Sequence, residues 1–518
     1  MEEGDGLTDE KGELLPVLST SAKKMDYDKL LKTPMPTFEG ATPGSPFWTN
    51  IGYFCLYRTF NNIFRTFEVT GNESIPTDRG SLCAAWHTNG LLDPISIFLT
   101  HPKRFVMGGR HDLVTRPLLG FWTRKFAVQP VVRKAELLRG GCSEEDATYL
   151  NGRSLLKLAT GISHGFGCAL FPEGTSHSES HLIRLRTGPM RTVLAAAAHA
   201  KATGNKTPVI LPIGLHFRVR HLYRTDAWVE FGEPIEVPSG DLPEELVTAV
   251  GNGDWSEPPA DTVIKLRDLL EEKLNYLTPN KETFDDYRAD QIVAHVKARK
   301  DGKRIPTWRE EVLAAREVRD NPPSSEALVI AKKIGRTLYD SKLDGRAINS
   351  KADGLDFIRE GDIKNPIISN IKLALFLLLL PVTIYSMSLQ IILGRKLGDT
   401  TDEGLDARTS YQFLAGMFGS LIMWPIGATI FVIISIVYEP ELESVIGIMW
   451  LDYLGTQLWQ QILTGILVWL SSIILFWISA NTFSLGADAI NDIKSFFNRR
   501  KLNSTISQDL LKLVKVLK

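Results

Sequence analysis

Between residues 66 and 240 the chain alternates short apolar runs with longer stretches of helical periodicity. Short apolar runs bounded by turn residues are typical of buried strands, and their alternation with helices indicates an α/β domain. The predicted strands cover 81–86, 104–109, 127–132, 167–171, 208–215 and 228–232. The predicted helices cover 92–100, 115–126, 144–164 and 189–202. We therefore expect an α/β domain whose sheet is largely buried.

Ahead of this region, residues 47–69 repeat aromatic side chains at helical spacing, with arginines among them. Polar residues are too frequent there for a membrane crossing, so the pattern favours a helix lying at a membrane surface. An amphipathic helix packed on a core explains the pattern equally well. Residues 1–45 are polar and lack an apolar segment of signal-peptide type, which predicts a disordered arm. The α/β domain with its interfacial helix then covers 46–240.

Three long apolar blocks lie in the C-terminal part of the chain, at 373–393, about 412–438 and about 458–480. Each is long enough to span a hydrocarbon core about 30 Å thick. Residues 371–482 are therefore predicted to form a membrane region. Residues 241–370, by contrast, are rich in charge and carry helical patches without a recognisable motif, which predicts a charged helical extension.

Basic residues constrain how these blocks cross the membrane. Three of them lie between the first and second blocks, and none lies in the acidic loop 439–457. The segment 483–518 carries seven, at Lys494, Arg499, Arg500, Lys501, Lys512, Lys515 and Lys518. The positive-inside rule is satisfied if 373–393, with Pro381 in its middle, is re-entrant and the other two blocks span. The α/β domain and the basic tail 483–518 would then both face the cytoplasm.

Composition narrows the function classes for this chain of 518 residues. A formal net charge of −1 argues against a nucleic-acid protein built on a basic surface. The four cysteines are scattered without zinc-ligand spacing, which favours a reduced compartment and predicts no metal. The histidines His177 and His181 lie outside any H-E-x-x-H pattern and are interpreted as surface residues.

The stretch "WHTNGLLDP" places His87 six positions ahead of Asp93 at the end of a predicted strand. A histidine held by a carboxylate is a general base with its orienting partner: His87 could deprotonate a hydroxyl, and Asp93 could stabilise the imidazolium. Taken alone, a His–Asp pair at this spacing is more often structural. The motif therefore needs support from the rest of the chain.

Three further segments carry candidate chemistry. In "FPEGTSH", Glu173, Gly174 and Thr175 lie in a polar turn after a predicted strand, and arginines and a helix start follow, a combination that suits a phosphate. An ordinary capping turn explains this segment equally well. In "PVVR", Arg133 follows a strand and could clamp an anion, while in "ILPIG", Pro212 marks a bulge or the end of pairing.

The order of "VTGNESIP", "WHTNGLLD", "PVVR", "FPEGTSH" and "ILPIG" resembles the glycerolipid acyltransferase superfamily over roughly residues 66–240. The resemblance implies a mixed central sheet flanked by helices, with His87 as general base and Asp93 as its partner. It also implies that Arg133, Glu173, Gly174 and Thr175 bind the acceptor and that Pro212 lies on the acyl-donor side. Five residues separate His87 from Asp93 where four are commoner. This longer form resembles eukaryotic glycerol-3-phosphate and dihydroxyacetone-phosphate acyltransferases that carry membrane segments after the catalytic domain.

The expected function is that of a membrane-bound acyltransferase of phospholipid synthesis in the endoplasmic reticulum or a bacterial or archaeal cell membrane. An acyl group would pass from acyl-CoA or an acyl carrier protein to glycerol 3-phosphate or dihydroxyacetone phosphate, without a metal or other cofactor. A lysophospholipid such as 1-acylglycerol 3-phosphate is an alternative acceptor, and an inactive scaffold is the non-enzyme alternative. The "GISHG" match would make Ser163 a hydrolase nucleophile, but the helical pattern before it and the strand after it reverse the required order.

Overall fold

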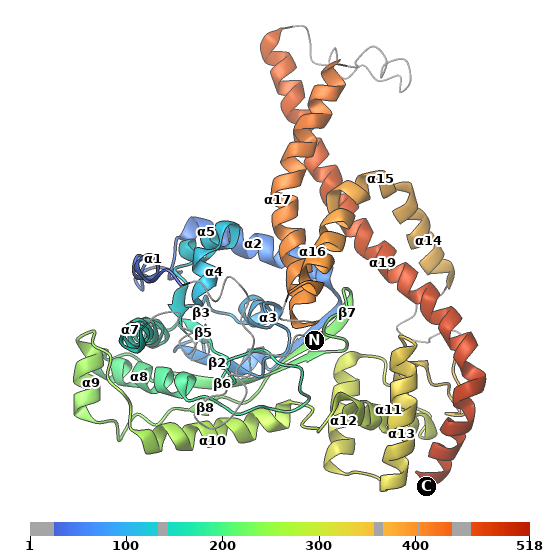
Figure 1. Cartoon of the computed structure of the whole chain (residues 1–518), viewed down its shortest axis with the longest axis horizontal. Coiled ribbons are helices and arrows are strands. Elements are labelled where there is room, and N and C mark those ends of the chain that lie inside the picture. Colours follow the sequence, from blue (N-terminus) through green and yellow to red (C-terminus); the bar gives the residue numbers. More distant parts are fainter. Residues whose placement is uncertain (1–24, 133–142, 357–365, 402–404, 438–456, 518) are drawn as a thin grey trace.

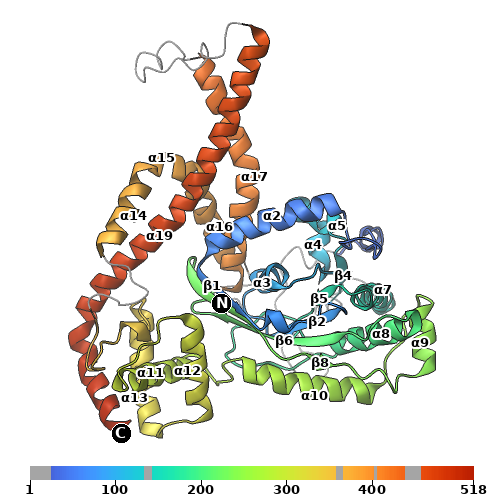
Figure 2. The same cartoon turned by 180° about the vertical axis from the view of Figure 1, so that it is seen from behind.

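The protein combines an α/β domain with a helical body and a projecting pair of long helices (Figure 1). The computed structural model describes residues 25–132, 143–356, 366–401, 405–437 and 457–517. The two long helices are α17 (Leu405–Val437) and α19 (Leu458–Val516). The view from behind shows α17 rising beside the α/β domain and α19 rising from the helical body, with the two helices together where they project (Figure 2).

A six-stranded mixed sheet forms the centre of the α/β domain, which confirms the expected fold class. Its main path runs β1-β7-β6-β2-β5, with β8 paired to β6. The strands are β1 (Phe64–Thr70), β2 (Ser81–Ala85), β5 (Gly167–Ala169), β6 (Val209–Phe217), β7 (Thr225–Phe231) and β8 (Ile235–Glu236). The pairs β1–β7, β2–β5 and β2–β6 are parallel, whereas β6–β7 and β6–β8 are antiparallel.

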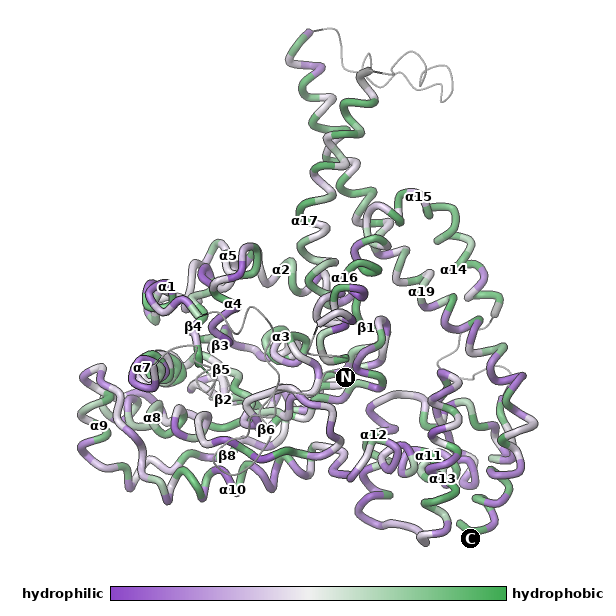
Figure 3. The backbone as a smooth tube through the Cα atoms, in the orientation of Figure 1, coloured by the Kyte–Doolittle hydropathy of each residue, from purple (hydrophilic) through white to green (hydrophobic). Residues whose placement is uncertain are grey.

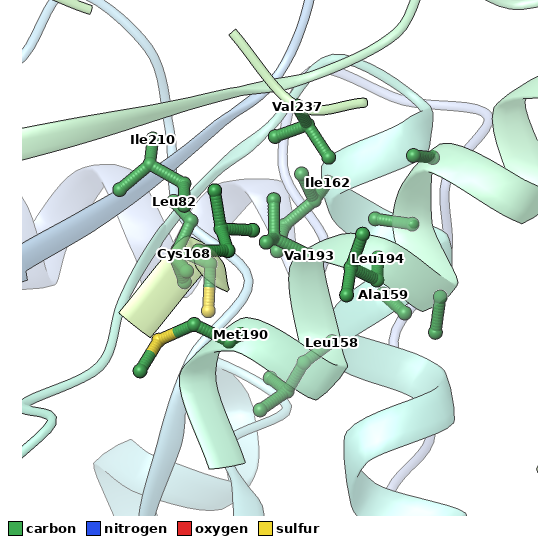
Figure 4. Packing of buried hydrophobic residues seen from close by; sticks show 14 of the residues in the cluster. Leu82, Leu158, Ala159, Ile162, Cys168, Met190, Val193, Leu194, Ile210 and Val237 are labelled. Atoms are coloured by element: carbon green, nitrogen blue, oxygen red, sulfur yellow. The ribbon is translucent and has the colours of Figure 1, made fainter. Parts of the chain in front are cut away.

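Successive residues of the central strands face opposite layers of helices, as the two-residue period of a strand requires. Leu82 and Ala84 pack toward α7 (Glu144–Ser163) and α8 (Gly188–Thr203), while Cys83 and Ala85 face the other cluster. Figure 4 shows Leu82, Cys168 and Ile210 of the sheet close to side chains of α7 and α8. The opposite layer contains α3 (Leu92–Thr100), whose Ile97 is fully buried.

Pro212 lies inside β6, at a break in the pairing along one side of that strand. Val209 and Ile210 pair with β8, and pairing with β7 begins at Ile213. The carbonyl of Pro212 accepts from Gly232 N on this same side, at 2.8 Å. Because N–H and C=O of one strand residue point the same way, the missing N–H of the proline falls in the gap between the two partners. The predicted local end of pairing is therefore present.

Two segments near the N-terminus differ from the sequence prediction. The helix predicted over 47–69 is α2 (Pro46–Ile63), and Phe64–Thr70 instead forms β1 against β7. Residues 25–45, predicted as disordered arm, include α1 (Tyr27–Leu31), whose Leu30 is fully buried against Val132 and Leu150. Residues 1–24 of the predicted arm lie outside the described residues.

The remaining elements of the α/β domain are short or lie at its edge. They are η1 (Asn72–Ser74), β3 (Gly108–Arg110), α4 (His111–Thr115), α5 (Pro117–Lys125), β4 (Gln129–Val131), α9 (Glu244–Gly251) and α10 (Ala260–Leu277). Strands β3 and β4 form a separate parallel pair. Leucines of α9 and α10 belong to the same buried cluster as the sheet, so this core extends past the predicted boundary at 240.

The helical body consists of α11 (Phe284–Lys300), α12 (Trp308–Asp320), α13 (Ser325–Asp340) and η2 (Gly345–Ala347). The C-terminal part of α19 completes its core, because Ile506, Leu510 and Leu513 are buried there. The predicted basic tail 483–518 is thus a helix packed on the extension rather than a free tail, as far as Val516.

Two described helical stretches, Ala407–Ser435 and Leu458–Val516, are long and apolar enough to cross a membrane. The projecting parts of α17 and α19 are largely apolar (Figure 3). With 59 residues, α19 is about 90 Å long, so only its first part fits a hydrocarbon core of about 30 Å. The predicted spans at 412–438 and 458–480 coincide with these apolar parts.

The first apolar block is bent. It comprises α14 (Pro366–Leu378), α15 (Leu380–Thr383), the π-helical turn η3 (Ile384–Ser388) and α16 (Leu389–Asp399). The two halves Ile367–Leu378 and Leu380–Asp399 meet at 75°, and only the two together are long and apolar enough to cross a membrane. Pro381 follows the break, where its ring and missing N–H interrupt helical hydrogen bonding. Whether this block is re-entrant or a broken span stays a prediction.

Candidate active site

His87 and Asp93 meet as their spacing predicts. His87 follows β2, Asp93 lies in the first turn of α3, and Nδ1 of the imidazole is 2.8 Å from Oδ2 of the carboxylate. Asp93 is fully buried, whereas the His87 side chain keeps 17% of its surface exposed. Since the carboxylate accepts from Nδ1–H, the other ring nitrogen, Nε2, is left as the basic atom.

The carboxylate of Asp93 also fixes the loop between the two residues. Its Oδ2 accepts from the backbone N–H groups of Thr88 and Asn89, both at 2.8 Å. Gly90 follows with a φ of 44°, a conformation that side chains other than glycine rarely adopt. The glycine accommodates the longer His–Asp spacing, and the imidazole and the loop are held by one buried oxygen.

The imidazole of His87 is further oriented by Phe171, which precedes the polar turn 172–176. The two ring centroids lie 4.1 Å apart with an interplanar angle of 18°. Stacking on an aromatic ring limits rotation of the imidazole, while Asp93 sets its tilt. The His87 imidazole is thus held in one orientation while 17% of its side-chain surface stays exposed.

Glu173 is placed differently from its predicted role as a ligand of acceptor hydroxyls. Its side chain is buried; Oε2 accepts from His87 N at 2.7 Å, and Oε1 accepts from Ile183 N at 3.0 Å and lies 2.8 Å from His177 Nε2. Both oxygens are therefore engaged within the protein. In this structure Glu173 joins the polar turn to the backbone of the candidate catalytic loop (residues 87–93), and its contact with acceptor hydroxyls stays a prediction.

The other residues of the polar turn are more accessible. Gly174 is exposed with a φ of 75°, and Thr175 is half-buried beside it. Arg186 contacts the turn through its backbone N–H, which donates to Pro172 O at 2.6 Å. Gly174 and Thr175 remain predicted acceptor ligands. Arg133 lies outside the described residues, so its predicted phosphate contact stays a prediction.

Two further residues, Arg220 and His177, connect the loops of the site. Arg220 donates from Nη1 to the carbonyls of Thr88 and His177, both at 2.7 Å, and from Nη2 to Ser178 Oγ at 2.6 Å. It therefore joins the loop of His87 to that of Glu173. His177, interpreted as a surface histidine, is instead 9% exposed and paired with Glu173. The i, i+4 spacing of Glu173 and His177 was the available signal for that pair.

A cavity of about 220 Å³ opens behind the catalytic loop, between the end of β6 and the helical body. Its described lining includes Trp86, Thr88, Arg218, Arg220, His221, Phe284, Tyr287, Arg288 and Tyr339, and no carboxylate. Burial and the neighbouring arginines lower the pKa of His221 to about 4, so this imidazole is neutral near pH 7. The guanidinium groups of the lining suit an anionic group with an apolar or aromatic neighbour. Two of them also pair with carboxylates outside the lining, Arg218 with Asp226 and Glu311 and Arg288 with Asp285.

The structure also bears on two other sites considered from the sequence, a hydrolase site at Ser163 and a metal site. Ser163 ends α7, and its Oγ lies 2.8 Å from His199 Nδ1, with a helix before the serine and β5 after it. This order is the reverse of a hydrolase nucleophile turn. No group of three or more His, Cys, Asp or Glu side chains suited to a metal ion occurs among the described residues. The absence of a metal from the reaction stays a prediction.

Comparison with known proteins agrees with the motifs. Residues 66–216 match the family model described as Acyltransferase. The chain is 29% identical to Glycerol-3-phosphate O-acyltransferase 2 of Saccharomyces cerevisiae over 153 residues, which cover 29% of this chain and 19% of that protein. It is also 29% identical to Glycerol-3-phosphate O-acyltransferase 1 of the same yeast over 136 residues, covering 26% of this chain and 16% of that protein. The matches thus span less than a fifth of these relatives.

A solved structure is also similar, the 1-acyl-sn-glycerophosphate acyltransferase PlsC from Thermotoga maritima. The alignment covers 42% of this chain and 79% of that chain, with 20% sequence identity and a TM-score of 0.27. The catalytic loop, the polar turn and β6 up to His216 all fall inside the family match at 66–216. Residues 66–216 thus match the Acyltransferase family model, and the resemblance of this chain to the glycerolipid acyltransferases is confirmed.

Proposed function

We propose that this protein is a membrane-bound O-acyltransferase that transfers a fatty acyl group from an acyl thioester to a hydroxyl of glycerol 3-phosphate or dihydroxyacetone phosphate. The observation that carries the proposal is the buried Asp93 holding an accessible His87 at 2.8 Å inside an acyltransferase domain. Two yeast relatives named as glycerol-3-phosphate O-acyltransferases favour this acceptor class over a lysophospholipid.

The reaction needs one base and no covalent enzyme intermediate. Nε2 of His87 takes the proton from the acceptor hydroxyl as its oxygen attacks the thioester carbonyl carbon. Asp93 stabilises the imidazolium that forms, because its carboxylate lies against Nδ1–H. When the tetrahedral intermediate collapses, the C–S bond breaks, and His87 returns the proton to the leaving sulfur. An ester and a free thiol are the products, without a metal.

The arginine-rich surroundings of the site support anionic substrates. Arg220 and Arg288 line the cavity behind the catalytic loop, and Arg186 lies exposed beside the polar turn. Both a phosphorylated acceptor and the carrier part of an acyl-CoA are anionic. Gly174, Thr175 and Arg133 are the proposed acceptor ligands, with Pro212 toward the donor.

The membrane helices bring the acyl donor and the product to one interface. Helix α17 begins against the acyltransferase domain, and α19 ends within the helical body on the same side. If α17 and α19 each cross the membrane once, the catalytic domain and the C-terminal part of α19 lie on the same side of the membrane. We propose that this side is cytoplasmic. Long-chain thioesters and acylated products partition into bilayers, so anchoring raises their local concentration.

The test is acyl transfer by membranes containing the full chain. Labelled palmitoyl-CoA or palmitoyl-acyl carrier protein is offered with glycerol 3-phosphate, dihydroxyacetone phosphate or 1-acylglycerol 3-phosphate. We expect transfer to one of the first two acceptors and a loss of at least about 10³-fold in His87→Ala. His164→Ala is the matched control, because His164 is exposed and follows Ser163 as the C-cap of α7.

Each other result changes the proposal. Transfer only to 1-acylglycerol 3-phosphate would move the chain to the lysophospholipid class. No transfer with any pair of donor and acceptor would favour an inactive scaffold. Full activity in His87→Ala would show that the His–Asp pair is structural.

A further inference from the structure

The first turns of α17 touch the catalytic loop directly. Thr409 Oγ1 donates to Asn89 Oδ1 at 2.8 Å, and the backbone N–H of Leu91 donates to Ser410 Oγ at 3.0 Å. Thr409 is 1% exposed and Ser410 is 7% exposed, so both hydroxyls act in a buried interface. Residues at the base of a candidate membrane span thus bond to the segment between His87 and Asp93.

Asn89 connects this contact to the catalytic pair. Its backbone N–H donates to Asp93 Oδ2, and its side-chain amide donates to Arg220 O at 3.2 Å, while Oδ1 accepts from Thr409. Asn89 is fully buried. A single residue, Asn89, therefore connects the Thr409 hydroxyl to the carboxylate that contacts His87.

Ser410 satisfies a backbone group that α3 cannot satisfy itself. The first N–H groups of a helix have no acceptor within the helix. Leu91 is the residue before α3, follows the left-handed Gly90, and finds its acceptor 319 residues away on α17. The serine hydroxyl therefore acts as a cap supplied by another helix, at the point where the longer His–Asp loop needs support.

Apolar packing between α17 and α3 lies next to these hydrogen bonds. Phe413 and Met417, one and two turns along α17, are buried with Leu92 and Ile95 of α3. Arg220 O also lies 3.2 Å from Thr409 Oγ1, on the strand side of the same contact. The base of α17 is thus fixed on two sides, against α3 and against the segment that follows β6.

We propose that Thr409 and Ser410 are positioning residues for acyl transfer, through which the membrane hairpin holds the His87–Asp93 loop in its reactive geometry. The inference rests on the proposed function. Loss of either hydroxyl leaves a buried loop group without its partner and lets the loop shift. Misplacement of a base by about 1 Å can cost up to about 10²-fold in rate, while contacts that bind substrate are retained. The effect therefore falls on kcat.

The experiment compares Thr409→Val, Thr409→Ser and Ser410→Ala in the full chain in membranes. We expect kcat to fall about tenfold in Thr409→Val and Ser410→Ala, with KM for donor and acceptor unchanged, and to recover in Thr409→Ser. Matched controls are Ser420→Ala and Thr464→Val, because those hydroxyls donate to backbone carbonyls of their own helices. The controls are expected to retain the kcat of the unchanged protein.

A second measurement follows the loop itself. Hydrogen–deuterium exchange of the peptide that covers residues 88–93 is expected to rise at least about tenfold in Ser410→Ala, because the Leu91 amide loses its acceptor. The Ser420→Ala control is expected to leave that exchange unchanged. This readout does not need activity, so it decides the inference even if no acceptor in the proposed class is acylated.

Three results would overturn the inference. Unchanged kcat and unchanged exchange in Thr409→Val and Ser410→Ala would show that the contact is incidental. A rise in KM alone would assign the hydroxyls to substrate binding. An equal loss in the Ser420→Ala and Thr464→Val controls would show a general effect on the membrane hairpin. None of these results bears on His87→Ala, which tests the proposed function separately.

Discussion

The α/β domain is held together internally by apolar contacts, whereas its junction with the helical body is held by buried charges. Inside the domain, alanines, leucines and isoleucines of α7, α8 and the sheet are nearly all inaccessible (Figure 4). At the junction, Arg218 Nε lies 3.0 Å from Asp226 and its Nη1 lies 2.5 Å from Glu311 of α12. All three of these side chains are at most 8% exposed.

A second buried pair repeats the pattern nearby. Arg316 of α12 donates to both carboxylate oxygens of Glu230 on β7, at 3.0 and 2.7 Å, and His216 lies on the same carboxylate. Apolar burial is not directional, so it stabilises a core without fixing the angle of a neighbouring body. Bidentate ion pairs fix both distance and orientation. The junction therefore sets one position of α11–α13 beside the catalytic loop.

The largest effect is expected for Asp93, a buried carboxylate that contacts the proposed catalytic base instead of joining two parts of the fold. Asp93→Asn should lower kcat by about 10³- to 10⁴-fold with little loss of folded protein, because the amide cannot stabilise the imidazolium and hold the same tautomer. Asp290→Asn is the matched control, since Asp290 is also fully buried and pairs with Lys281 in the helical body. Comparable losses of kcat in both variants would mean that Asp93 is structural.

The next effect tests the charged junction. Arg218→Met should destabilise the protein by about 3–5 kcal/mol, because Asp226 and Glu311 stay buried with fewer partners. The change is measured as a lower Tm in detergent. Arg267→Met serves as control, because the pair Arg267–Asp268 is exposed and such pairs contribute little. An unchanged Tm in Arg218→Met would contradict the view that charges fix the junction.

The stability of the domain core and the stability of the junction should also depend on pH over different ranges. Burial lowers the pKa of His101, in the domain core, from 6.5 to about 4; its stabilising contribution is complete above pH 6.5 and is lost as pH falls toward 4. For Glu230, burial raises the pKa, but His216 and Arg316 outweigh it and lower the value from 4.5 to about 2. Its contribution is complete above pH 4.5 and is lost below.

These windows are separated by measuring Tm between pH 8 and about pH 3. His101→Gln should flatten the profile between 6.5 and 4, and Glu230→Gln should flatten it only below 4.5. Glu230→Gln also removes a charged partner of Arg316, so the Tm of this variant near neutral pH should already be lower than that of the unchanged protein. A Glu230→Gln profile that changes only between 6.5 and 4.5 would contradict the assignment.

The smallest effect concerns a single neutral hydrogen bond at the junction. Trp308 donates from Nε1 to His216 O at 3.0 Å, and Arg218 lies over its ring at 4.5 Å. Trp308→Phe should destabilise the protein by about 1–2 kcal/mol, visible as a small fall in Tm. Trp459→Phe, at an exposed indole on α19, is expected to change little. If Tm fell as far in Trp308→Phe as in Arg218→Met, apolar contacts would contribute more to the stability of the junction than the buried charges do.

The sequence determined the features that depend on neighbours along the chain. The short apolar runs of β2 and β6, the helical periods of α3, α7 and α8, and the spacing of His87 and Asp93 all express local geometry. The motif order also identified the domain, since its blocks follow one another between residues 66 and 216. Local patterns of this kind can be read because a period or a spacing fixes which side chains share a face.

Only the tertiary structure decided the contacts made over long separations. Phe64–Thr70 reads as helix because its aromatics continue the spacing of α2, and pairing with β7 makes it a strand. Glu173 reads as a ligand in a polar turn, and in the structure it is buried and accepts a hydrogen bond from His87 N. Thr409, Ser410 and Arg220 carry no local signal, since their partners lie between 42 and 320 residues away and packing alone brings them together.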